Sequence, residues 1–216
     1  MTDGEPLIPK HGGYRKLKSF QIAQLVYDVT VQFCERYVDR FSRTRDQMVQ
    51  AARSGVQNIA EGSQASGTSK KTELKLTNVA RASLEELRLD YEDFLRQRAL
   101  PTLPPDHPAL VRFKARRCAS LEEVREWVKQ EHTDGHGPSR TSTDEHENQK
   151  RSLSVGESPC SSVCPSALVA NAALSLLNLC CHLLDRQLAA QASAFEQEGG
   201  FTERLYRTRS QARRKP

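Results

Sequence analysis

The clearest pattern in the chain is a stripe of mostly apolar positions between residues 167 and 195. Its members recur at alternating intervals of three and four residues, and they are Ala167, Ala170, Leu174, Leu177, Cys181, Leu184, Leu188, Gln191 and Phe195. This spacing is typical of the packed face of an α-helix. It predicts a long helix over 166–198, capped by Ser166 and ended by Gly199 and Gly200.

Three more helices are predicted upstream, at about residues 20–41, 46–61 and 70–98. The first has an aromatic-rich face that includes Phe41, and Ser19 is its expected N-cap. The second follows a polar corner and should stop at Gly62. Its face is made of small residues such as Gly55, which let a neighbouring helix approach closely. Ser69 is the expected cap of the third helix.

The composition changes after Leu100, where four prolines fall within eight residues and stop the helix. Short helices are predicted over 109–117 and 120–131, the second opened by the capping box Ser120-Leu-Glu-Glu123. Residues 133–165 have almost no apolar side chains and are expected to form a disordered loop.

These patterns predict an all-α protein: an antiparallel up-and-down four-helix bundle with a long, partly disordered insertion between helices three and four. The expected divisions are an N-terminal tail (1–13), helices one to three (14–100), the insertion (101–165), the fourth helix (166–198) and a basic C-terminal suffix (199–216).

The fourth helix has more apolar surface than one packed face can hide. The extra leucines lie off the main stripe, and they are Leu168, Leu176, Leu179 and Leu183. Leaving them in water is costly, so either the 109–131 segment or a second subunit should cover them. We favour a second subunit, which makes these four leucines the predicted interface of a homo-oligomer.

Composition fits a folded protein, with 37% apolar and 27% charged residues in a chain of 216. No run of eighteen apolar residues and no secretory signal is recognisable, so we expect a cytoplasmic protein with no membrane role. The six cysteines are expected to be reduced, because several lie on apolar helical faces.

The net charge of +5 is unevenly distributed. Antiparallel geometry should gather Arg36, Arg40, Arg43 and Arg45 at one end of the bundle, together with Arg96 and Arg98. Lys70, Lys71 and Lys75 should meet Arg15, Lys16 and Lys18 at the other end. The suffix adds Arg204, Arg207, Arg209, Arg213 and Arg214. These residues are the candidate contacts for RNA or DNA, although nearby carboxylates offer local neutralisation instead.

Aromatic and apolar residues are interleaved with the arginines of the suffix, namely Phe201, Leu205 and Tyr206. An aromatic ring can stack on a nucleic-acid base. These side chains can equally dock the suffix on the bundle or on a neighbouring subunit, and docking is the interpretation we favour.

Catalytic and metal-binding patterns are weak. Glu61 more simply holds a helix end than performs acid–base chemistry, and no Glu-x-x-His pair suggests a di-iron site. His132, His136, His146, Cys160 and Cys164 lie in low-complexity sequence with loose spacing. We therefore expect no catalytic residue, no metal and no cofactor.

Three motifs occur in order in the first half of the chain: Gln57-Asn-Ile-Ala-Glu-Gly62, Ser69-Lys-Lys-Thr-Glu-Leu74 and Asn78-Val-Ala-Arg-Ala-Ser-Leu-Glu-Glu-Leu87. With these motifs, residues 14–98 resemble a family of four-helix-bundle proteins first noticed as reading frames inside intervening sequences of bacterial large-subunit ribosomal RNA genes. The closing segment is similar to a variant branch with a C-terminal suffix.

The resemblance implies an up-and-down bundle, often oligomeric, with no enzymatic activity assigned to most members. One relative, the accessory protein of diversity-generating retroelements, engages a reverse transcriptase and nucleic acid. The sequence thus predicts a non-enzymatic, self-associating bundle that presents basic surface to nucleic acid, as an accessory to a nucleic-acid enzyme. The alternative is a protein-interaction or structural scaffold, with a protein partner and no nucleic-acid role.

Overall fold

The computed structural model describes residues 8, 10–134 and 163–214, and every regular element in these ranges is helical. The chain is therefore all-α, as predicted. After the short 3-10 helix η1 (Tyr14–Lys16), the helices are α1 (Lys18–Tyr37), α2 (Arg43–Ala65), α3 (Lys70–Gln97), α4 (Pro108–Arg116), α5 (Leu121–Asp134), α6 (Pro165–Glu198) and α7 (Phe201–Arg214). The predicted 133–165 loop lies mostly outside the described residues.

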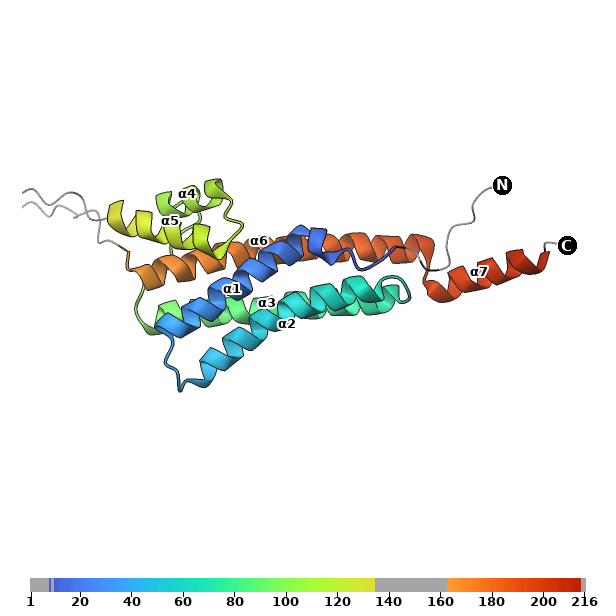
Figure 1. The fold of residues 1–216 in the computed structure, drawn as a ribbon, viewed down its shortest axis with the longest axis horizontal. Helices are drawn as coiled ribbons and strands as arrows, with labels where there is room; N and C mark the ends of the chain where they lie inside the picture. The colour runs from blue at the N-terminus through green and yellow to red at the C-terminus, as the bar shows by residue number, and fades with distance from the viewer. Residues whose placement is uncertain (1–7, 9, 135–162, 215–216) are drawn as a thin grey trace, which may run out of the picture.

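Four long helices lie side by side and enclose the core (Figure 1). Helix α1 packs against α2 and α6, and α3 packs against the same two helices. Helices α4 and α5 lie over one part of α6 and extend the same apolar core, in which the Phe113 and Trp127 rings are 4.7 Å apart. Helix α7 continues beyond the far end of α6 (Figure 1).

Two sequence expectations about α1 are wrong. The helix begins at Lys18, so Ser19 lies inside its first turn, where the buried hydroxyl donates to Gln187 Oε1 of α6 at 2.9 Å. It also ends at Tyr37, which leaves Phe41 in the α1–α2 corner with 80% of its surface exposed.

Helix α2 does not stop at Gly62 but continues to Ala65. Gly62 marks a close approach to α3 instead, because an added Cβ would lie 3.3 Å from the Glu73 carbonyl oxygen. At Gly55 a Cβ would lie 2.6 Å from Leu84 Cδ2 of the buried core. The predicted close approach at the small-residue face is thus confirmed, and α3 is the neighbour.

Several predicted helix ends are confirmed by capping contacts. Ser69 Oγ accepts from Thr72 N at 3.2 Å at the start of α3. Ser120 Oγ accepts from Glu123 N at 3.3 Å. Gly199 ends α6 with a φ of +74°, a conformation that favours glycine. Ser166, by contrast, is not a cap, because α6 begins one residue earlier after Cys164.

One buried amide ties the proline-rich segment to α6. Asn171 is 1% exposed, and its Oδ1 accepts from Leu103 N at 2.7 Å. Its Nδ2 donates to Pro101 O at 2.9 Å and to Ala167 O at 2.8 Å. This single side chain therefore satisfies both a donor and an acceptor of a segment that has no helix of its own.

We predict that Asn171→Ala destabilises the protein by about 2–4 kcal/mol, because it leaves buried peptide groups without partners. Urea unfolding followed by helical circular dichroism measures the change. Asn178→Ala is the matched control, because Asn178 is an exposed amide on the same helix. Equal losses in the two variants would contradict a special role for Asn171.

Asp90 is a half-buried carboxyl on α3 with a perturbed ionisation. Burial, together with the nearby carboxylates of Glu86 and Asp93, raises the pKa of Asp90 to about 6. The ionised form is thus penalised in the folded chain but not in the unfolded chain. This penalty is complete above about pH 6 and disappears as the pH falls toward the ordinary value.

We predict that Asp90→Asn stabilises the protein by about 1 kcal/mol near neutral pH, a value reduced for the solvent contact of this group. The gain should shrink between about pH 7.5 and about pH 4.5, because the wild-type carboxyl becomes protonated in the fold. Unfolding curves at several pH values test this expectation. A gain independent of pH would show that ionisation of Asp90 is not its source.

Candidate functional site

The α1–α2 corner carries the first predicted cationic cluster. Arg36, Arg40 and Arg43 are exposed and Arg45 is half-buried. The Phe33 ring of α1 packs edge-on against Phe94 of α3, with centroids 4.6 Å apart. This contact brings the end of α3, which carries Arg96 and Arg98, to the same end of the molecule.

Two arginines at this end lie over aromatic rings. The Arg40 guanidinium is 4.5 Å from the centroid of the exposed Phe41 ring, and that of Arg98 is 3.9 Å from Phe94. Arg96 pairs with Asp93 at 2.7 Å. Among the described residues, no ion pair involves the four arginines of the corner. An exposed ring beside cations can stack on a base while the arginines contact phosphates.

The second predicted cluster, at the start of α3, is partly neutralised. Lys70 Nζ lies 3.3 Å from Glu73 Oε2, whereas Lys71 and Lys75 are exposed. Glu73 also accepts from Gln191 Nε2 of α6 at 3.1 Å. Arg15, Lys16 and Lys18, which were predicted to join this cluster, are also exposed. Among the described cations of this end, only Lys70 is paired with a carboxylate.

The suffix forms a helix, α7, which the sequence analysis did not predict. Arg207, Arg209 and Arg213 are exposed, Arg204 is half-buried, and the side chain of Arg214 lies outside the described residues. Tyr206 is 74% exposed. No described element packs extensively against α7, so this fold does not show the suffix docked on the bundle of its own chain, one of the two forms of docking expected. Docking on a neighbouring subunit stays a prediction.

The predicted oligomer interface is only partly accessible. Leu168 and Leu176 are 2% and 6% exposed, because the chain covers them with its own residues. Their burial leaves them unavailable to a second subunit in this fold, and α4 and α5, which come from the alternative 109–131 segment, pack against α6. Leu179 is 46% exposed and Leu183 is half-buried, so these two remain available to a partner.

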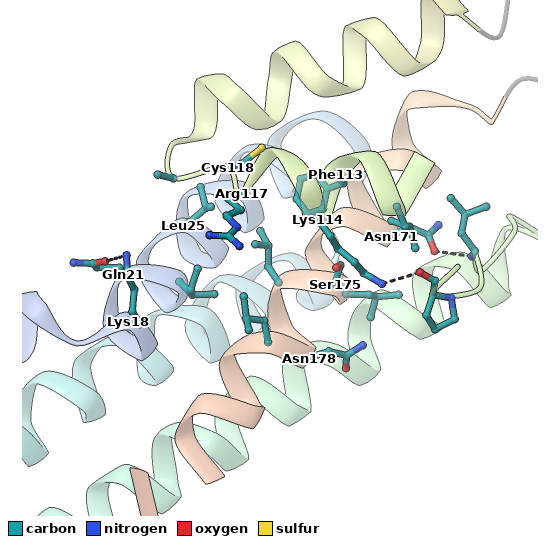
Figure 2. A pocket seen from close by; sticks show the side chains of 18 of the residues that line it. Lys18, Gln21, Leu25, Phe113, Lys114, Arg117, Cys118, Asn171, Ser175 and Asn178 are labelled. Carbon is teal, nitrogen blue, oxygen red and sulfur yellow. Dashed lines mark hydrogen bonds between the residues drawn. The ribbon is translucent and has the colours of Figure 1, made fainter. Parts of the chain in front are cut away.

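A groove of about 920 Å³ lies between α1, α4, α6 and the proline-rich segment (Figure 2). Its apolar lining comes from three helices: Ile22 and Leu25 of α1, Leu110 and Phe113 of α4, and Leu176 and Leu179 of α6. The sequence analysis missed this groove, because it forms only when the proline-rich segment folds back beside α6.

Three cations from different parts of the chain line the same groove. Lys18 Nζ donates to Gln21 Oε1 at 3.0 Å, and Lys114 Nζ donates to Pro105 O at 2.8 Å. Arg117 reaches into the space between α4 and α1 (Figure 2). The lining carboxylate, Glu92, lies 3.0 Å from Arg88 Nη1. The groove thus joins an apolar floor to a positively charged rim.

The thiols of the core are poorly suited to nucleophilic chemistry. Burial raises the pKa of Cys34 to about 11 and that of Cys180 to about 12. A thiol with so high a pKa stays protonated near neutral pH. No cluster of three potential metal ligands occurs among the described residues, and Cys160, His136 and His146 lie outside them.

Comparisons with family models, with curated proteins and with solved structures found no match for this chain. The resemblance to the ribosomal intervening-sequence family therefore stays a prediction. One apolar window within Pro165–Arg213 is long and hydrophobic enough to cross a membrane, with a mean hydropathy of 1.8. Inside the fold, 67% of that window is buried, as in a core helix.

Proposed function

We propose that this protein is a non-enzymatic, self-associating helical-bundle protein that presents basic surface to nucleic acid, as an accessory to a nucleic-acid enzyme. We further propose that α1, α2, α3 and α6 form an antiparallel up-and-down four-helix bundle of the ribosomal intervening-sequence type, located in the cytoplasm. The ring of contacts among these four helices supports this arrangement.

The observation that carries the proposal is the exposure of α7. Its arginines extend from a helix that the rest of the chain leaves largely uncovered, and Tyr206 lies among them. Arginine pairs with phosphate through a planar fork of donors, and a tyrosine ring stacks on a base. One contact links the helix to α6, because Arg207 Nη2 donates to Glu198 O at 2.7 Å across the Gly199–Gly200 turn.

The α1–α2 corner supports the same function. Arg40 lies over the exposed Phe41 ring, and Arg36 and Arg43 are exposed at the same corner. The corner thus repeats the combination of cations and an aromatic ring found on α7. Local carboxylates such as Asp39 and Asp46 reduce its field, which makes α7 the stronger of the two surfaces.

We predict binding to mixed-sequence single-stranded RNA or DNA whose affinity falls linearly on a log–log plot against salt concentration. Replacing Arg204, Arg209 and Arg213 by Gln should lower the slope by about 2, because about 0.7 is lost for each phosphate contact on a single strand. Arg207 is kept so that α7 stays attached to α6. Fluorescence anisotropy with labelled oligonucleotides measures the slope.

The matched control removes the same charge elsewhere, by changing the exposed Arg53, Lys129 and Arg186 to Gln. An equal effect of both triple variants would assign binding to net charge rather than to α7. No binding at low salt would reject the nucleic-acid role and favour the interaction-scaffold alternative, which a pull-down from nuclease-treated lysate then tests.

Self-association is proposed through the exposed part of α6. We predict that Leu179→Gln combined with Leu183→Gln shifts the protein toward monomer, because the two leucines lie four residues apart on one helical face. Sedimentation velocity over a range of concentrations measures this shift. Leu89→Gln, at a leucine of α3 that is 54% exposed, is the control. A wild-type chain that is monomeric throughout would remove self-association from the proposal.

A further inference from the structure

We propose that the groove between α1, α4 and α6 binds a long-chain acyl carboxylate, with the aliphatic chain on its floor and the carboxylate beside Arg117 and Lys114. This site uses none of the arginines of α7 or of the α1–α2 corner, so it is independent of the proposed nucleic-acid surfaces. It shares Leu179 with the proposed self-association surface.

The floor of the groove is suited to an aliphatic chain. Its volume of about 920 Å³ is at the upper end of the range of about 300–1,000 Å³ typical of small-molecule sites. The aliphatic and aromatic side chains of three helices converge on it, and Leu179 remains 46% exposed at its edge. Covering this surface with a hydrocarbon chain removes apolar area from water and is therefore favourable.

The charge of the rim favours an anionic head group. Lys18 and Lys114 donate to neutral oxygens, and no carboxylate pairs with Lys18, Lys114 or Arg117 among the described residues. Glu92 is held by Arg88 instead. The groove thus has an excess of positive charge that a single carboxylate would complement.

Two amides of the lining already have partners within the chain. The Asn171 amide is occupied by Leu103 and Pro101, and the Gln21 amide by Lys18 and the Arg15 carbonyl. A peptide backbone entering the groove would give up water without finding these two amides free. A saturated chain has no polar group to desolvate and needs no such partner.

The backbone at Arg117 places this residue at the edge of the groove. Arg117 has a φ of +52° and ends α4 in the left-handed conformation. The chain turns there, and the guanidinium reaches into the groove (Figure 2).

The test titrates the purified full chain with dodecanoate, below the concentration at which it forms micelles, by isothermal calorimetry. We expect saturable binding of one dodecanoate per chain, and no saturable binding of dodecyltrimethylammonium, which has the same tail and the opposite charge. Arg117→Gln combined with Lys114→Gln should weaken dodecanoate binding by at least about fivefold, the effect expected from partly exposed ion pairs.

The matched control is Lys71→Gln combined with Lys75→Gln, which removes two exposed lysines outside the groove and should leave binding unchanged. Helical circular dichroism confirms that each variant is folded. Equal binding of the two dodecyl compounds, or equal losses in the two double variants, would overturn the proposal. So would binding of an acidic leucine-rich peptide without binding of dodecanoate, or occupation of the groove by a second copy that excludes dodecanoate.

Discussion

The amide of Asn171 is the contact on which the arrangement outside the long helices depends. It holds the backbone of Leu103 and Pro101 against α6, at the point where four prolines deprive the chain of helical hydrogen bonds. From this segment the chain continues into α4 and α5, which lie on α6 (Figure 1). The groove, with Lys114 and Arg117 on its rim, exists only in this arrangement. One polar side chain inside an apolar helix thus holds the segment from which α4 and α5 continue.

The long helices could be predicted from the sequence because their apolar spacing is regular, and both Ser69 and Gly199 mark ends that the structure confirms. The predicted limits of α1 and α2 were wrong for a physical reason. Phe41 has the right spacing for a core position, but it follows the end of α1 and lies in water. Gly62 is a residue type that often ends a helix, but here its lack of a side chain allows α3 to approach α2 closely. Spacing alone does not distinguish a glycine that ends a helix from one that admits a neighbour.

The candidate surfaces, too, could be predicted only in part. Basic residues can be counted in a sequence, and the corner arginines lie where antiparallel packing would bring them. The ion pairs of these residues cannot be read from the sequence. Lys70 forms an ion pair with Glu73, whereas the arginines of the α1–α2 corner form none in the described part of the chain. The groove was beyond prediction because its lining joins residues from Lys18 to Leu179. The lone Asn171 among apolar neighbours was the available signal, since a buried amide requires partners.

Helices α2 and α3 are joined by only four residues and share a tight seam at Gly55, whereas Ser19 meets Gln187 across 168 positions. Contacts between helices that are close in sequence form faster than contacts between distant helices. The topology therefore indicates the order in which the helices assemble. During synthesis α2 and α3 can pair as soon as both have left the ribosome. The apolar sides of α1 and α3 must wait for α6, the last long helix to be translated. The nascent chain consequently exposes apolar surface during most of its synthesis. Chaperones or early contact with a second nascent chain would cover this surface.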